Sequence, residues 1–348
     1  FGGGSPSTLG AEALQGLVAA LDRAFPPEPG AERSLELDPG RVDETYLGVL
    51  LDLGFTRLSF GIQDFEPEVL KKVGRREDPA TVSRHLGYLR SRGFDAVSFD
   101  LMLGLPSQSV ETLRGTLEKV VSLRPSRLAL FPYAHVPWMM PHQEALERYA
   151  LPSSEERLAM YGLAHRLLPE AGYLPVGMDH FALDGDELVE ASRAARLHRN
   201  FMGYTTRPGL DQIGLGVSSI SDLGASYAQH TKDLGAYRAS LEGGRLPFER
   251  ALLLGRDDEV RRAVIMSLLC NFQADLDEIG RRFDLDWRGA FDDDLERLGP
   301  LEADGLLVRP GEGGLLRVTP LGRPFVRIAC MAFDRYLEEG GARYSRTL

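Results

Sequence analysis

The stretch Phe55-Thr-Arg-Leu-Ser-Phe-Gly61, which continues into Ile62 and Gln63, decides the fold of this chain. It is a short run rich in apolar residues that follows Gly54 and ends in a polar side chain. Glycine is the commonest residue at the left-handed end of a helix, so Gly54 predicts a helix end and the stretch predicts a strand. A polar residue at its end is typical of the mouth of a parallel sheet.

The same pattern recurs on both sides of this stretch. Five apolar runs within residues 1–135 end in glycine or a polar side chain before a predicted helix, at Gly2-Gly3-Gly4, Glu36, Gln63, Asp100 and Ala134-His135. Their spacing of roughly 25 to 40 residues is that of one strand plus one helix. The rhythm predicts a parallel β/α barrel, in which these strand ends line one mouth.

The rest of the chain predicts two further regions. Residues 1–150 carry the regular rhythm and residues 151–250 complete the barrel, with a helix, a strand over Tyr173–Met178 and a polar, aromatic loop up to Thr206. Residues 251–348 are mostly helical and include a two-stranded wing, Leu307-Val308 with Leu315–Val318. We therefore expect an α/β fold, a partial (open) β/α barrel, followed by a winged helical domain.

Composition excludes several classes of function. The chain has 348 residues, is 43% hydrophobic and carries a formal net charge of -11, which argues against a nucleic-acid partner. No apolar stretch reaches the roughly 18 residues that cross a bilayer, so we expect no membrane partner and a cytoplasmic location. The two cysteines, Cys270 and Cys330, lie in apolar helical patterns and predict buried reduced thiols. No HExxH pattern occurs, so no metal ligands are assigned.

The strand ends carry the candidate binding groups. Gly2-Gly3-Gly4-Ser5 offers backbone N–H groups to a ligand, although a plain tight turn explains it about as well. A carboxylate such as Glu36 in an apolar strand needs a cation or a ligand donor, and an ion pair with an arginine is the alternative. Because Gln63 and Asp100 repeat this situation on neighbouring strands, the three together favour a ligand with several donors.

Two later motifs also carry polar groups. Asp179-His180 is a candidate acid–base pair, but neighbours on a strand face opposite ways, so we expect the two side chains to have separate roles. The segment 198–204 mixes cationic, amide and aromatic groups, which suits a flat ligand with carboxylates; a packed surface loop is the alternative.

These residues together show a resemblance to a known family. The chain resembles the oxygen-independent coproporphyrinogen III dehydrogenases (oxidases), radical S-adenosylmethionine enzymes of haem synthesis, over essentially its whole length. The segments that carry the resemblance are Phe1-Gly-Gly-Gly-Ser-Pro6, Glu36-Leu-Asp-Pro39, Leu58-Ser-Phe-Gly-Ile-Gln-Asp-Phe65, Asp100-Leu-Met-Leu-Gly-Leu-Pro106, Tyr133-Ala-His135, Gly177-Met-Asp-His-Phe-Ala182, Leu197-His-Arg-Asn-Phe-Met-Gly-Tyr-Thr-Thr206 and Cys330-Met-Ala-Phe-Asp-Arg-Tyr-Leu337.

The resemblance implies cofactors and site residues. Such enzymes hold a four-iron four-sulfur cluster and two S-adenosylmethionines. Carried over residue by residue, the cosubstrate contacts are Gly3, Gly4, Ser5, Glu36, Gln63, Arg75, Asp100, Ala134 and Ile220. We add the hypothesis that the substrate contacts are His198, Arg199, Phe201 and Met202. No catalytic residue is assigned.

The implied reaction is an oxidative decarboxylation. A 5'-deoxyadenosyl radical takes a hydrogen from a propionate side chain of coproporphyrinogen III, and loss of CO2 and one electron leaves a vinyl group. Two such events give protoporphyrinogen IX in anaerobic haem biosynthesis. The implied partners are the porphyrinogen substrate and an electron donor for the cluster, and we expect a monomer.

The sequence departs from the family in two places. The family's C-x3-C-x2-C cluster loop precedes the glycine-rich turn, whereas this chain begins at Phe1, so we expect the first strand and the cluster ligands to lie outside it. We expect an exposed sheet edge there and a chain that is inactive alone. Met202 also stands where the family typically has glutamine.

Two other classes of function compete with this reading. A protein of the same fold without a cluster would bind porphyrin or haem. A lyase or hydrolase on the same barrel would use Glu36, Gln63 and Asp100 for acid–base work.

Overall fold

The computed structural model describes residues 1–339, which form two compact units. The first includes Phe1–Val189 and the second begins at Glu190. The prediction of three regions divided at residues 150 and 250 is not tested by these observations and stays a prediction.

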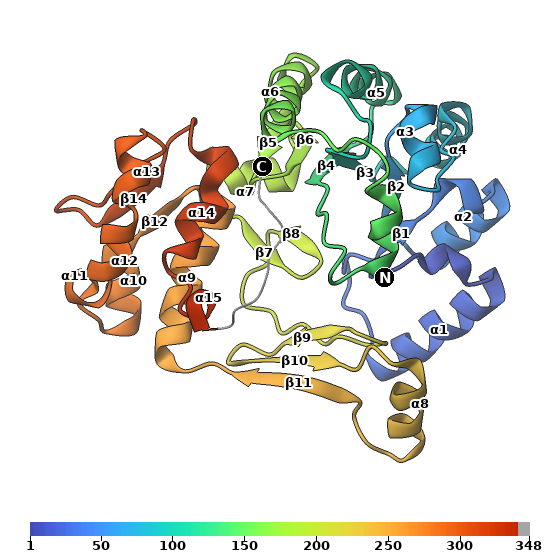
Figure 1. The fold of residues 1–348 in the computed structure, drawn as a ribbon. Helices are drawn as coiled ribbons and strands as arrows, with labels where there is room; N and C mark the ends of the chain where they lie inside the picture. The colour runs from blue at the N-terminus through green and yellow to red at the C-terminus, as the bar shows by residue number, and fades with distance from the viewer. Residues whose placement is uncertain (340–348) are drawn as a thin grey trace. The chain divides into compact units, whose positions relative to one another are not determined.

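The first unit is a sheet with helices along one side (Figure 1). Its strands are β1 (Ser34–Leu37), β2 (Arg57–Gln63), β3 (Val97–Leu103), β4 (Arg127–Pro132), β5 (Tyr173–Val176) and β6 (His180–Leu183). Its helices are η1 (Pro6–Thr8), α1 (Ala11–Ala24), η2 (Pro39–Arg41), α2 (Glu44–Asp52), α3 (Pro67–Lys72), α4 (Pro79–Ser91), α5 (Val110–Leu123), η3 (Pro141–Leu146) and α6 (Ser154–Glu170), and α7 (Glu187–Arg193) follows.

The strand order is β1-β2-β3-β4-β6-β5. Strands β1 to β4 pair in parallel, whereas β6 runs antiparallel to both β4 and β5, so that β5 has the same direction as β4. The predicted β/α rhythm is confirmed, and the fold class with it. The one strand that the rhythm does not predict is β6, because a four-residue strand that follows a tight turn has no helix to separate it from β5.

Local sequence explains where the helices begin and end. Ser109 and Ser153 cap α5 and α6 in reciprocal capping boxes, and Asp78 caps α4 just before Pro79. Gly54 and Gly93 follow α2 and α4 with φ of 75° and 74°, which glycine adopts without strain. These signals mark the helix boundaries that separate β1, β2, β3 and β4 along the chain.

Phe1 lies at the outer edge of β1. Its amino group donates to the Ser34 carbonyl at 2.7 Å, and its carbonyl accepts from Glu36 N at 2.9 Å. The sheet edge that we expected to be exposed therefore carries one residue of strand-like pairing.

The second unit contains a hairpin, a three-stranded sheet and a helical part. The hairpin is β7 (His198–Asn200) with β8 (Gly203–Thr205), and the sheet has the order β11 (Phe248–Leu253), β10 (Ser226–His230), β9 (Ile220–Asp222). The loop predicted up to Thr206 is therefore wrong in part, because β6, α7, β7 and β8 lie within it. Strands of three or four residues are too short to show a period of two.

The helical part is built on α9 (Arg256–Asn271). After α9 it also includes α10 (Leu276–Phe283), α11 (Trp287–Ala290), α12 (Asp292–Arg297), α13 (Gly299–Ala303), η4 (Arg323–Phe325), α14 (Val326–Met331) and α15 (Tyr336–Glu339), whereas α8 (Leu234–Glu242) lies in the connection between β10 and β11. The predicted wing is present as β13 (Leu307–Val308) and β14 (Leu315–Val318), and β12 (Gln273–Asp275) adds a third strand that was not predicted.

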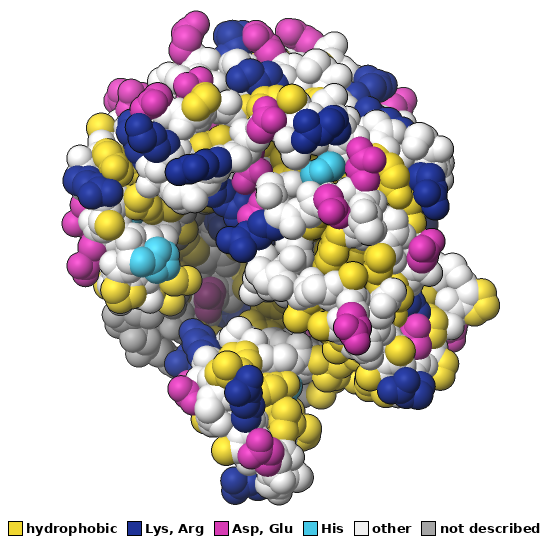
Figure 2. Space-filling model, turned by 90° about the vertical axis from the view of Figure 1, so that its right-hand side faces the viewer, with side chains coloured by type: hydrophobic (Ala, Val, Ile, Leu, Met, Phe, Trp, Pro, Cys, Tyr) yellow, Lys and Arg dark blue, Asp and Glu magenta, His cyan; other side chains and the backbone are white. Residues whose placement is uncertain are grey.

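The surface carries charges of both signs. On the face drawn in Figure 2, basic and acidic side chains are interspersed. No helix within residues 1–339 is long and apolar enough to cross a bilayer.

Candidate active site

The strands of the first unit have two different faces. In β2, Leu58, Phe60 and Ile62 are fully buried in the core, whereas Ser59, Gly61 and Gln63 are partly exposed. Strand β3 alternates in the same way, with Asp100 on its partly exposed face. Since paired residues in a sheet have side chains on the same side, the register aligns these polar and small residues on one face.

The register also brings predicted residues into two rows across the sheet. Glu36 pairs with Ser59, and Gly61 pairs with Asp100. Ala129 then follows Asp100, and His180 follows Ala129. In the second row the small residues Gly61 and Ala129 lie on either side of Asp100.

Glu36 contacts the glycine-rich turn. Its Oε2 accepts from Gly3 N at 3.3 Å, and a Cβ built on Gly2 would lie 2.6 Å from its Oε1. Any side chain at position 2 would therefore displace the carboxylate. The two motifs at Gly2-Gly3-Gly4 and Glu36 thus form one structure, as their predicted positions on neighbouring strand ends implied.

Asp100 is the most perturbed carboxyl of this face. Burial raises its pKa to about 6, and repulsion from Glu36 acts in the same direction. A hydrogen bond of 2.8 Å from Ser59 Oγ and the nearby His180 act in the opposite direction. A carboxyl with a raised pKa in a partly exposed position is typical of a functional site. Sequence reasoning did not select Ser59, although its period-two spacing from Gly61 and Gln63 could have done so.

The side chains of Gln63 and Arg75 both lie over Gly61. A Cβ at Gly61 would lie 3.3 Å from Gln63 Nε2 and 3.7 Å from Arg75 Nη1, so the missing side chain makes space for both. Arg75 Nη1 donates to the Gly61 carbonyl at 2.9 Å. Because Gly61 pairs with Asp100, the structure brings Gln63, Arg75 and Asp100 to the same part of the sheet.

Gln63 has a strained backbone that a buried network supports. Its φ is 66°, which is uncommon for a residue with a Cβ. The next residue, Asp64, is fully buried and accepts hydrogen bonds from Phe65 N, Thr116 Oγ1 and Gln108 Nε2. The loop after β2 is therefore held to α5, and strain of this kind often marks a site. No sequence pattern indicated this network.

Two predicted contacts lie on loops. The Ala134 carbonyl follows β4 and accepts from Gln143 Nε2 at 3.2 Å. Ser5 precedes η1, and its carbonyl accepts from Thr8 N and Thr8 Oγ1. All of these hydrogen bonds use a backbone carbonyl.

Asp179 and His180 correct one expectation. Asp179 Oδ1 lies 2.7 Å from His180 Nδ1, so the two side chains contact each other and do not face opposite ways. The reason is that β6 begins at His180, while Asp179 lies in the preceding turn, where the alternation of a strand does not apply. Asp179 is buried, and His180 packs edge-on against Phe131.

The proposed substrate residues lie on the β7–β8 hairpin. Arg199 stacks over the Tyr204 ring at 4.8 Å, and Phe201 packs edge-on against Tyr227. Met202, at the hairpin turn, is 56% exposed. Burial, with repulsion from Arg282, lowers the pKa of His198.

Ile220 lies on a different element of the second unit. It begins β9 and pairs with Gln229 of β10. A Cβ at Gly214 would lie 2.7 Å from the Ile220 carbonyl, so the backbone before β9 passes close to it. The main chain of Ile220 therefore lies between β10 and the segment around Gly214.

The two cysteines are confirmed as buried free thiols. Cys270 is on α9 and Cys330 on α14, and burial raises the pKa of Cys330 to about 12. The described residues contain no group of three His, Cys, Asp or Glu side chains arranged for a metal ion. A cluster held by three thiolates cannot be ligated by the cysteines of this chain.

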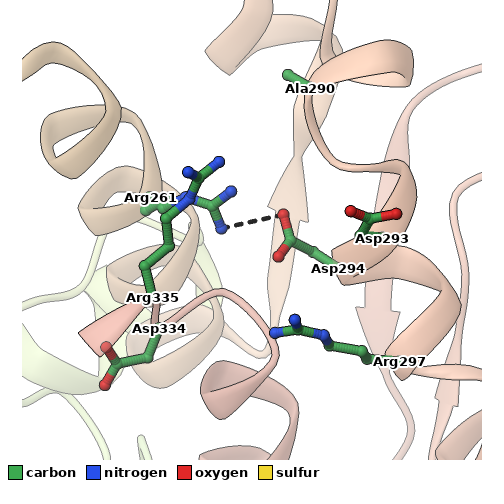
Figure 3. Close-up of a pocket in the computed structure, with 7 residues that line it drawn as sticks. All are labelled: Arg261, Ala290, Asp293, Asp294, Arg297, Asp334 and Arg335. Carbon is green, nitrogen blue, oxygen red and sulfur yellow. Dashed lines mark ion pairs between the residues drawn. The ribbon is translucent and has the colours of Figure 1, made fainter. Parts of the chain in front are cut away.

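A charged cavity of about 290 Å³ lies in the helical part of the second unit (Figure 3). Arg261, which is buried, pairs with Asp294 at 3.0 Å and with Asp257 at 2.9 Å. Opposite charges that neutralise each other in this way serve packing, so we do not assign this cavity to the site.

Comparisons with known proteins agree with this geometry. The radical SAM superfamily matches residues 1–120, and the HemN C-terminal domain matches residues 254–325. An oxygen-independent coproporphyrinogen III oxidase of Synechocystis sp. is 42% identical over 342 residues, which cover 97% of this chain and 73% of the relative. The oxidase of Escherichia coli (strain K12) is 40% identical over 339 residues, with 97% and 74% covered.

A solved structure shows the same fold. The coproporphyrinogen III oxidase (HemN) from Escherichia coli, described as a radical SAM enzyme, matches with a TM-score of 0.90 and 39% identity, over 96% of this chain and 76% of that one. Identity of this size over nearly the whole chain shows that the chain belongs to the family of oxygen-independent coproporphyrinogen III oxidases within the radical SAM superfamily.

Proposed function

We propose that this chain carries the cosubstrate and substrate sites of an enzyme that decarboxylates two propionate side chains of coproporphyrinogen III to vinyl groups, giving protoporphyrinogen IX in anaerobic haem biosynthesis. The relatives at about 40% identity bear the name of this activity. The observation that carries the proposal is the convergence of Glu36, Asp100, Gln63 and Arg75 on one partly exposed face of the barrel sheet.

These side chains fit S-adenosylmethionine. That molecule carries an ammonium group, ribose hydroxyls, a carboxylate and an adenine. Carboxylates such as Glu36 and Asp100 accept from ammonium and hydroxyl groups, and the Arg75 guanidinium suits a carboxylate. The family resemblance also assigns Gly3, Gly4, Ser5, Ala134 and Ile220 to the two cosubstrates.

The hairpin residues fit the porphyrinogen. Arg199 and His198 are cationic or hydrogen-bonding groups that can hold propionate carboxylates, and Phe201 offers an aromatic surface to a flat macrocycle. Met202 lies beside it at the turn and cannot supply the polar contact of the glutamine that the family typically has there. The protein's part in the reaction is to orient these groups and to exclude water.

The iron–sulfur cluster does not fit the residues of this chain. Its two cysteines are buried in the second unit, and a cluster of this kind needs thiolates. A reduced cluster held by thiolates would supply the electron for the cleavage of S-adenosylmethionine. We therefore propose that the chain binds cosubstrate and substrate, and that turnover needs cysteines from outside these 348 residues.

The proposal extends to the location, the oligomeric state and the electron donor of the enzyme. We place it in the cytoplasm as a monomer that receives electrons from a separate reductant. Light scattering of the purified chain tests the monomer, and a mass twice that of 38.4 kDa would contradict it.

Calorimetric titration with S-adenosylmethionine and with coproporphyrin III tests the binding sites. We expect both to bind, and Asp100→Asn to weaken S-adenosylmethionine by about tenfold, which is about 1.4 kcal/mol. Glu68→Ala, an exposed carboxylate on α3, is the matched control. Binding of the porphyrin with no S-adenosylmethionine binding would favour a cluster-free porphyrin or haem binder instead.

Sequencing the gene upstream of the Phe1 codon tests the catalytic part. Cysteines spaced C-x3-C-x2-C in frame, and vinyl product from that longer protein after anaerobic reconstitution with iron and sulfide, are the expected result. Decarboxylation without iron or reductant would instead support a lyase on the same barrel.

A further inference from the structure

Glu77 lies beside Arg75 in the segment between α3 and α4. Its side chain is 4% exposed, whereas that of Arg75 is 31% exposed. Arg75 Nη1 lies 3.4 Å from Glu77 Oε1 and 2.9 Å from the Gly61 carbonyl. Two acceptors from different segments therefore hold one nitrogen of the guanidinium.

The other nitrogens of Arg75 are left for a ligand. Within residues 1–339, the hydrogen bonds that Arg75 side-chain atoms make all involve Nη1. Nε and Nη2 carry the remaining donors of the planar fork, whose geometry matches a carboxylate. Gln63 Nε2 lies close to Arg75 over Gly61, so this fork belongs to the site already described.

Glu77 is costly to keep in this position. Burial raises its pKa, and the Asp38 carboxylate adds to the effect, while Arg75 acts in the opposite direction. A Cβ at Gly40 would lie 3.3 Å from Asp38 Oδ1 and 3.8 Å from Glu77 Oε2, so both carboxylates lie close to this glycine. A buried carboxylate next to a like charge destabilises a protein unless it holds a cation.

We infer that Glu77 is a positioning residue, which orients the Arg75 guanidinium so that its Nε and Nη2 bind the carboxylate of S-adenosylmethionine. The inference rests on the proposed function, because it takes S-adenosylmethionine as the ligand of Arg75. A residue that acts through Arg75 has a specific thermodynamic signature, since its effect on binding disappears once Arg75 is removed.

A double-mutant cycle on the purified 348-residue chain tests this. Dissociation constants are measured by calorimetry for S-adenosylmethionine and for its decarboxylated analogue, with wild type, Glu77→Ala, Arg75→Ala and the double variant. We expect Glu77→Ala to weaken S-adenosylmethionine by about tenfold and the analogue by less than about twofold, because the analogue lacks the carboxylate. In the Arg75→Ala background, Glu77→Ala should change affinity by less than about twofold.

Two further variants separate positioning from folding. Glu77→Gln keeps an oxygen that accepts from Nη1, so it should retain affinity within about threefold of wild type even if Glu77→Ala folds poorly. Glu68→Ala is the matched exposed control and should have no effect. Additive losses in the cycle, equal losses for both ligands, or wild-type affinity in Glu77→Ala would each overturn the inference.

The proposed function fails separately. A wild-type chain that binds neither S-adenosylmethionine nor its analogue would contradict the cosubstrate site as a whole. A wild-type chain that binds both, with no coupling between positions 75 and 77, contradicts the role of Glu77 alone.

Discussion

Two groups of charged side chains in this protein are built in opposite ways. In the second unit, Arg261 is buried between Asp294 and Asp257, so opposite charges compensate each other (Figure 3). In the first unit, Asp100 faces Glu36, a like charge, and its direct partner is the neutral hydroxyl of Ser59. Compensated charges serve packing, whereas like charges held together cost stability and indicate a place where a ligand supplies the missing donors.

Removing one charge from the compensated group, which is Arg261 with Asp294 and Asp257, should have the largest effect on stability. Asp294→Ala leaves the buried Arg261 without its partner at 3.0 Å, which we expect to lower the free energy of unfolding by about 3 to 5 kcal/mol. Urea unfolding followed by circular dichroism measures it. Asp293→Ala, at an exposed neighbouring position, should stay within about 0.5 kcal/mol of wild type. Similar losses in both variants would remove the contrast between the two groups.

Removing the charge of Asp100 from the uncompensated group, which is Asp100 with Glu36, should instead raise the free energy of unfolding. The pKa of Asp100 is about 6 in the folded chain against an ordinary value of 3.8, so the folded state binds more protons between these pH values and stability falls as pH rises through them. Above pH 6 the full cost is present, up to about 3 kcal/mol. Asp100→Asn should therefore stabilise the protein by up to this amount at pH 8.

The pH dependence of that variant is the check. The difference in unfolding free energy between Asp100→Asn and wild type should shrink as pH falls from 6 to 4, since Asp100 is then protonated in the folded state and becomes protonated in the unfolded state as the pH approaches 3.8. A gain in stability that is independent of pH would show that the carboxylate charge is not its cause.

The effect of S-adenosylmethionine on the melting temperature tests whether the group around Asp100 binds the ligand, and we expect a smaller change than those above. S-adenosylmethionine should raise the melting temperature of wild type and raise that of Asp100→Asn less, because the variant has one charged acceptor fewer. Asp293→Ala should respond as wild type does. An unchanged response of Asp100→Asn would place the ligand elsewhere.

Ser59→Ala should have the smallest effect. Its hydroxyl donates to Asp100 Oδ2 and holds the pKa of that carboxyl down, so removal should raise the pKa further above about 6. The expected cost in stability is about 1 kcal/mol. Carbon NMR of labelled aspartate follows the titration, and an unchanged pKa would contradict this role of Ser59.

Much of the first unit could be predicted from the sequence. The apolar runs that end at Glu36, Gln63 and Asp100 repeat at the length of a strand plus a helix, and serine, proline and glycine mark where helices such as α4 and α5 begin and end. Each of these signals involves residues that are close together in the chain, so it can be recognised in a single sequence. The shared face of Glu36 and Asp100 followed from them, because parallel strand ends meet at one edge.

The tertiary structure decided the rest. Ser59 and the Asp64–Gln108–Thr116 network act through partners distant in the chain, and no local pattern marks those partners. Glu77 is close to Arg75 in the chain, but its burial beside Asp38 depends on the fold. The pairing of Asp179 with His180 depended on where β6 begins, and the short strands β6, β7, β8 and β12 had too few residues for a period. Sequence periodicity determines which face of an element is buried, but the partner of a charged side chain is set by folding, since it comes from whichever segment the fold brings beside it.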